Sequence, residues 1–64
     1  MVLINFSNQL SAGPKNISLN FIKEILKEDS VNEYIFILPS IDEFLDFKDT
    51  KNVTFRFVEV GNGL

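Results

Sequence analysis

Three consecutive small residues, Ser11, Ala12 and Gly13, form the stretch of this sequence whose residue types could do chemistry. They stand between an apolar run at residues 2–6 and Pro14, which suits the first position of a helix because its missing N–H would have no partner there. Small side chains let a ligand approach the backbone closely, and a helix N-terminus offers free N–H groups and about half an electron of positive charge. A loop that faces a phosphate group is one interpretation. A strand-to-helix turn that needs small residues for packing is the other.

The composition excludes several kinds of site. The 64 residues include no histidine and no cysteine, which rules out catalytic triads built on either residue and thiolate metal sites. The small-residue loop also lacks the glycine patterns of dinucleotide-binding folds and P-loops. A formal net charge of −3 argues against non-specific nucleic-acid binding, which needs clustered Lys and Arg. We therefore predict no metal site, no cofactor and no nucleic-acid partner.

The sequence carries no signal for a membrane or for export. Its apolar runs are much shorter than the ~20 residues of a membrane span. Its N-terminus lacks a basic region followed by a long apolar one. We expect no transmembrane segment and a cytoplasmic location.

The pattern of apolar residues predicts five elements. Runs rich in β-branched and aromatic residues predict strands at residues 2–6, 34–38 and 53–60. Apolar residues at steps of three and four predict a helix at residues 14–28, with Ser18 on its polar side. The apolar stripe of that helix is expected to consist of Ile17, Phe21, Ile22, Ile25 and Leu26.

A short second helix is expected at residues 41–47, where Ser40 and Glu43 have the spacing of a capping box. The acidic residues around it are predicted to face water rather than to act as paired catalytic carboxylates. These residues are Asp42, Glu43, Asp46 and Asp49.

The order strand, helix, strand, helix, strand with short connections predicts an α/β fold. Right-handed crossovers then give a Rossmann-like βαβαβ half-unit of three parallel strands in the order 3-2-1, with both helices on one face. The first two strands are apolar on both faces, yet the chain supplies helices for only one. We therefore expect residues 1–64 to be a single partial domain, the start of a larger protein, or else to self-associate.

Three stretches resemble the opening of a known enzyme family. They are the strand Val2-Leu3-Ile4-Asn5-Phe6-Ser7, the loop Ser11-Ala12-Gly13-Pro14, and the helical sequence Ile17-Ser18-Leu19-Asn20-Phe21-Ile22-Lys23-Glu24-Ile25-Leu26. In this order they resemble the start of retaining GT-B glycosyltransferases, the class often called family four or group 1. Those enzymes usually have a glycine pair where this chain has Ala12 and Gly13.

The resemblance implies a function for a longer parent protein. In that family the N-terminal Rossmann-like domain mainly holds the acceptor, and its glycine loop lies near the donor diphosphate. The parent would transfer a hexose from a nucleotide sugar to a glycan, lipid or small acceptor. The C-terminal donor-binding domain is not among these residues. The resemblance thus implies that the 64 residues alone are inactive, with Ser11, Ala12 and Gly13 facing the substrate and with catalytic residues that lie elsewhere.

Two non-catalytic functions stay open. A regulatory module of the flavodoxin or receiver type would have acidic residues at the end of the first strand, where Asn5, Ser7 and Asn8 stand instead. A small self-associating α/β interaction module would cover its bare sheet face with a second copy.

Overall fold

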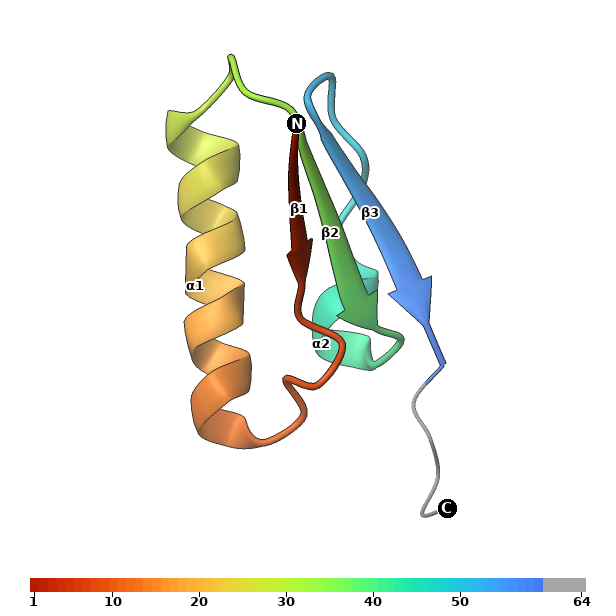
Figure 1. Cartoon of the computed structure of the whole chain (residues 1–64). Helices are drawn as coiled ribbons and strands as arrows, with labels where there is room; N and C mark the ends of the chain where they lie inside the picture. The colour runs from red at the N-terminus through yellow and green to blue at the C-terminus, as the bar shows by residue number, and fades with distance from the viewer. Residues whose placement is uncertain (60–64) are drawn as a thin grey trace.

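Two α-helices and three β-strands alternate along the computed structural model, which describes residues 1–59 (Figure 1). In chain order they are β1 (Val2–Asn5), α1 (Ala12–Glu28), β2 (Tyr34–Pro39), α2 (Asp42–Leu45) and β3 (Val53–Val58). The predicted elements are confirmed in type and order, with shifted ends. α1 begins at Ala12 rather than Pro14, and α2 is a single turn. The predicted end of the third strand at Val60 lies outside the described residues.

All three strands are parallel and form one sheet in which β2 lies between β1 and β3. Ile4, Phe36 and Phe55 stand side by side across it. Because side chains alternate along a strand, these three residues point to one face and their chain neighbours point to the other.

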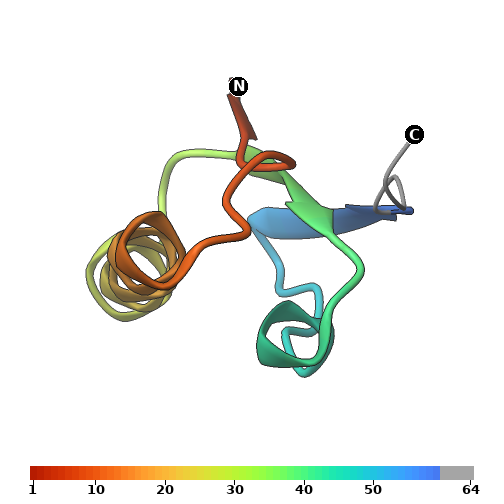
Figure 2. The ribbon, with the colours of Figure 1, turned by 90° about the horizontal axis from the view of Figure 1, so that it is seen from below.

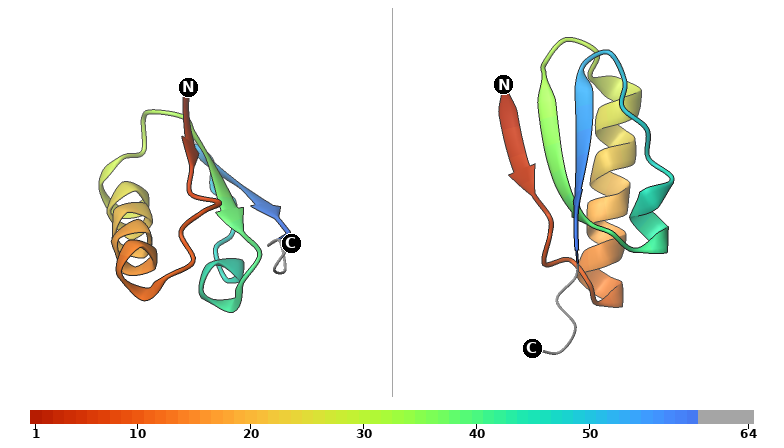
Figure 3. Two further views of the ribbon diagram at one scale, coloured as in Figure 1. Left: turned by 60° about the horizontal axis from the view of Figure 1, so that its bottom comes forward. Right: turned by 90° about the vertical axis from the view of Figure 1, so that its right-hand side faces the viewer.

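Both helices pack on the same face of the sheet (Figures 2 and 3). The buried core lies between them and the sheet. Its members are Ile22, Phe36, Leu38, Phe44, Val53 and Phe55.

Phe36 is the centre of that core. Its ring is fully buried and stacks on Phe55 at 5.7 Å and on Tyr34 at 6.0 Å between centroids. The rings of Phe6 and Phe21 lie 6.0 and 6.3 Å from it between centroids. One residue of the central strand thus contacts β3, α1 and the residue that follows β1 through aromatic rings, and each contact stabilises the fold beyond its buried area.

The face of α1 that packs on the sheet differs from the predicted stripe. Ser18 is only 2% exposed, whereas Ile17 is 71% exposed. The small Ser18 side chain lets the helix approach the sheet, and its hydroxyl donates to the Pro14 carbonyl at 3.0 Å, so burial leaves no polar atom unpaired. The assignment of Ser18 to the polar side and of Ile17 to the buried stripe was wrong.

The predicted capping box is also wrong. Ile41, not Ser40, is the N-cap of α2, and no side chain caps that helix. The Ser40 N–H instead donates to the Val58 carbonyl and extends the β2–β3 ladder. The Glu43 carboxylate accepts from the Lys15 ammonium at 2.8 Å, so it does not reach back to the start of its own helix.

The other face of the sheet has no helix over it among residues 1–59 (Figure 3). By register and alternation this face carries Leu3, Asn5, Ile35, Ile37, Thr54 and Arg56. Leu3 is 62% exposed, and the two isoleucines are half-buried. We refer to these six residues as the open face.

Within the described part of the chain, neither helix is long and apolar enough to cross a membrane.

Phe36→Ala should be the most damaging truncation in the chain. It removes the ring on which four other aromatic side chains pack, and such core changes cost about 3–5 kcal/mol. Because a domain of this size has little stability to lose, the variant should be unfolded at 25 °C by circular dichroism. Val31→Ala is the control, since Val31 is exposed, and it should change the urea midpoint very little. A folded Phe36→Ala protein would contradict this description of the core.

Candidate functional site

Ser11, Ala12 and Gly13 lie where the sequence places them, beyond the carboxyl end of β1 and at the start of α1 (Figure 1). Ser11 is the N-cap residue with extended backbone, and its carbonyl accepts the Lys15 N–H at 2.9 Å. Ala12 and Gly13 are the first two helical residues. All three are exposed. This is the sheet edge at which open α/β folds bind ligands.

The first turn of α1 has the features of an anion site. The leading N–H groups of a helix have no intrahelical partner, and here the Ser11 side chain makes no capping hydrogen bond to them. The first turn contains no acidic residue that would offset the positive end of the helix dipole. An anionic group could therefore accept directly from the backbone of Ala12 and Gly13.

Packing among the described residues does not require a glycine at position 13. A β-carbon at this position would meet no atom within 4 Å, and the backbone is not in the left-handed region. Packing within the described chain therefore supplies no reason for a glycine, and the explanation of this loop as a packing turn has no support at this residue.

Lys15 connects the first turn of α1 to α2. Its ammonium lies 2.8 Å from the Glu43 carboxylate, a residue 28 positions away in sequence. The hydrogen bond from Lys15 holds the pKa of Glu43 below its usual range. Because the positive charge of Lys15 is already paired with Glu43, this side chain does not supply a free cation at the start of α1.

A shallow groove of about 340 Å³ borders this ion pair. It is lined by Leu19, Lys23, Glu43, Asp46 and Phe47. Glu43 and Asp46 thus line one groove, but Glu43 is paired with Lys15, and the described residues hold no cluster of three acidic side chains that could bind a metal ion.

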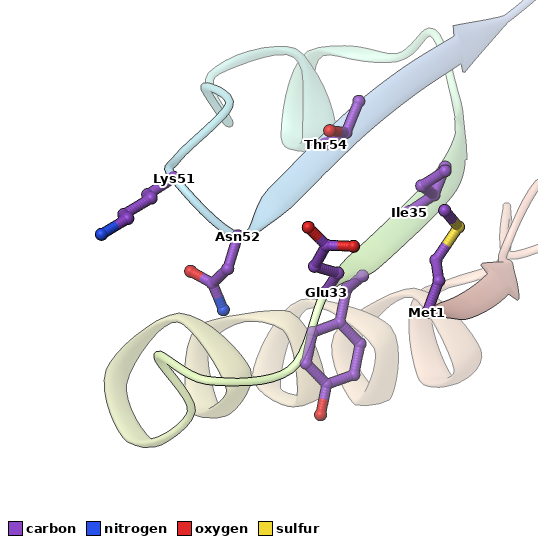
Figure 4. A pocket seen from close by; sticks show the side chains of 7 residues that line it. Met1, Glu33, Ile35, Lys51, Asn52 and Thr54 are labelled. Carbon is purple, nitrogen blue, oxygen red and sulfur yellow. The ribbon is translucent and has the colours of Figure 1, made fainter.

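A second, smaller pocket of about 180 Å³ lies at the opposite end of the strands, near their amino ends (Figure 4). Its lining residues come from the start of β1, β2 and β3 and include Met1, Glu33, Lys51 and Thr54. The Lys51 side chain extends away from the others in Figure 4. None of the predicted site residues belongs to this pocket.

The same end of the strands carries a hydrogen-bond network that sequence reasoning missed. The Asp29 carboxylate accepts from the N–H groups of Val31 and Asn32, from the Asn32 amide, and from the Tyr34 hydroxyl, all within 3.0 Å. The Asn52 amide donates to the carbonyls of Asp29 and Asn32 and so ties the connection before β2 to the connection before β3. An Asp three residues before an Asn is a recognisable turn signal, but the contact with Asn52 spans 23 residues.

These hydrogen bonds change the pKa of two residues, Asp29 and Tyr34. Donation by the Asn32 side chain and by the neighbouring N–H and O–H groups holds the pKa of the Asp29 carboxyl well below its usual range. Donation to that carboxylate raises the pKa of Tyr34. The network holds the turn together without any feature of a ligand site.

Comparison of the chain with protein-family models, with curated proteins and with solved structures finds no match. The fold is a small open-sheet α/β unit whose first helix begins, with exposed residues and no side-chain cap, beyond the carboxyl end of its first strand.

Loss of the Asp29 carboxylate should change how stability depends on pH. A carboxyl group with a lowered folded-state pKa stabilises the fold above its usual pKa near 4, and that stability disappears as the pH falls below it. The free energy of unfolding should therefore fall between pH 5 and pH 2, and Asp29→Asn should be less stable at pH 7 and less sensitive to pH. Urea titrations at several pH values measure both effects. Glu24→Gln, which removes one carboxylate from α1, is the matched control, and equal pH slopes for the two variants would contradict the role of Asp29.

Proposed function

We propose that these residues form the start of the acceptor-side, Rossmann-like domain of a glycosyltransferase. The whole enzyme transfers a hexose from a nucleotide sugar to a glycan, lipid or small acceptor in the cytoplasm. The observation that carries the proposal is the exposed start of α1, where Ala12 and Gly13 offer backbone N–H groups and where packing does not demand a glycine.

The arrangement of the sheet supports a partial Rossmann-like domain. β2 is central, its neighbours are parallel to it, and both connections pass over the same face. A doubly wound sheet has helices on both faces, and its ligands bind beyond the carboxyl ends of its strands. In the proposed parent, further elements cover the open face, and the Ser11–Gly13 loop borders the cleft between two domains.

The chemistry of sugar transfer gives this loop a specific role. When the bond between the sugar carbon and the diphosphate oxygen breaks, negative charge grows on the diphosphate, while an acceptor oxygen forms the new bond to that carbon and loses its proton. N–H groups fixed at a helix start stabilise such charge without having to reorient. Ser11, Ala12 and Gly13 are therefore assigned to substrate binding, and the groups that activate the acceptor and bind the nucleotide lie outside these residues.

A non-catalytic interaction module is the alternative, and one observation favours it. The open face, where Leu3, Ile35 and Ile37 lie beside polar residues, and the outer edge of β1 are uncovered among the described residues, as in proteins that bind a partner through a sheet.

A valine at position 13 should distinguish between two explanations of the loop, substrate binding and packing. In the full-length gene product, Gly13→Val should cut transfer by about 10²- to 10³-fold if the backbone N–H groups contact the reacting phosphate, because its side chain blocks their approach. Stability should change by less than about 0.5 kcal/mol, because a β-carbon fits there and valine is a slightly better helix residue than glycine. Activity is measured with a panel of radiolabelled nucleotide sugars.

Asn20→Val is the matched control, since it places the same β-branched residue on the exposed surface of α1, two turns away. It should leave turnover and donor affinity unchanged. A folded Gly13→Val enzyme with normal turnover and donor affinity would show that the loop does not contact the donor. A full-length product that transfers no sugar from any donor in the panel would overturn the proposed function.

A further inference from the structure

β1 and β3 are the two outer strands of the sheet, and their outward-facing backbone groups differ in whether they have hydrogen-bond partners. In β3 the outward groups belong to Val53, Phe55 and Phe57, because the intervening residues bond to β2. Thr50, in the connection before β3, bonds to the outward groups of Val53. The Val53 N–H donates to the Thr50 hydroxyl at 3.2 Å, and the Val53 carbonyl accepts the Thr50 N–H at 2.8 Å. The Phe55 N–H donates to the Asp49 carboxylate at 2.8 Å.

The outer edge of β1 has no comparable protection among residues 1–59. The Val2 N–H donates to the Glu33 carbonyl just before β2, and the Phe6 N–H donates to the Ile37 carbonyl of β2. The backbone groups that alternate with them, at Leu3 and Asn5, therefore point outward. No described residue bonds to these outward backbone groups. Proteins usually protect such an edge with charged side chains, but the first charged side chain in this sequence is Lys15.

Apolar surface continues on both sides of this edge. Leu3 lies on the open face, and Phe21 of α1 contacts Phe6 at 6.0 Å between ring centroids while remaining 42% exposed. Ile17 stands one helical turn before Phe21 and is exposed as well. A partner at the β1 edge would therefore meet unpaired backbone groups with apolar side chains nearby, and an extended, uncharged strand can match both.

We propose that β1 is a homodimerisation edge on which the β1 strand of a second copy of this chain pairs in antiparallel orientation. With the two-fold axis between the two Ile4 residues, Leu3 of each copy lies opposite Asn5 of the other. The outward N–H and C=O groups of both residues are then all paired, which gives four hydrogen bonds. A continuous six-stranded sheet results, and both copies keep their helices on the same face. The proposal concerns the 64-residue chain itself and does not depend on transferase activity; in the complete doubly wound sheet of the proposed parent, a further strand would pair with this edge of β1 instead.

β1 itself has the properties that a strand pairing with this edge needs. It is uncharged and extended, and it has two outward residues with Ile4 between them. An antiparallel pair centred on Ile4 brings the two Ile4 side chains together on the helix face, where each already packs against the core. No charged side chain within β1 opposes this pairing.

Proline at position 3 tests the proposal, because it removes an outward N–H without breaking the ladder to β2, as edge-strand prolines do. The wild-type chain should sediment as a dimer, and Leu3→Pro should weaken dimerisation by at least tenfold while circular dichroism shows a folded monomer. Leu3→Thr is the matched control because it also loses the leucine side chain but keeps the N–H, and it should dimerise better than Leu3→Pro. Phe57→Pro, which removes an outward N–H from β3, should leave dimerisation intact.

A second measurement keeps the proposal testable if Leu3→Pro does not fold. In a mixed sample of isotope-labelled and unlabelled wild-type chains, isotope-filtered nuclear Overhauser spectra should show a contact between the Ile4 α-protons of the two copies. A wild-type chain that stays monomeric at millimolar concentration would overturn the proposal. So would a dimer in which this contact is missing, or one that Phe57→Pro disrupts as much as Leu3→Pro does.

Discussion

The structure depends on one constraint: a sheet whose central strand is apolar on both faces is covered by helices on only one of them. Phe36 and Leu38 of β2 are fully buried beneath α1 and α2, while Ile35 and Ile37 on the other face are only half-buried. With both crossover helices on the same face, the fold gains one well-packed core around the Phe36 ring. The open face and the outer edge of β1 are the places where the described residues leave the sheet incomplete.

Different contacts hold the connections at the two ends of the strands. At the amino edge, Asp29 and Asn52 bind the two helix-to-strand connections to each other and so fix the start of β2 relative to β3. At the carboxyl edge, the Lys15–Glu43 ion pair joins the two helices but leaves the first N–H groups of α1 exposed. The Glu43 carboxylate of the ion pair is exposed and Asp29 is half-buried, so each contributes modestly to stability, and their main effect is to hold connections in place. The edge with free backbone donors is also the edge at which parallel sheets bind ligands.

The sequence predicts most of this fold because its signals are local. Long apolar runs bounded by turn residues predict the three strands, and the three- and four-residue spacing predicts α1. The predictions fail where tertiary contacts override local preference. Ser18 is buried because a small residue lets α1 approach the sheet, and Ile17 is exposed because the helix presents a different side to it. The Ser40 cap is missing because its N–H extends the ladder to β3 and Glu43 pairs with Lys15 from another helix.

The candidate site could be predicted only in part. The place of Ser11, Ala12 and Gly13 follows from the strand before them and from Pro14 after them, since both are local signals. The contact of these residues with a diphosphate is a proposal, supported by the family resemblance and by the exposed, uncapped start of α1. The Asn52 contacts and the protected edge of β3 were not predictable, because they join residues far apart in sequence or depend on which side of a strand a connection passes.

The most direct measurement of the one-sided core is the exposure of methyl groups to a soluble paramagnetic probe. In the 64-residue chain, a gadolinium chelate should enhance the relaxation of the Leu3 methyl groups most and of Ile35 and Ile37 to an intermediate degree, because these residues lie on the open face. Ile22 and Leu38, which are fully buried beneath the helices, should be almost unaffected. Equal shielding of both sets of methyl groups would show that the second face of the sheet is covered and would contradict the one-sided core.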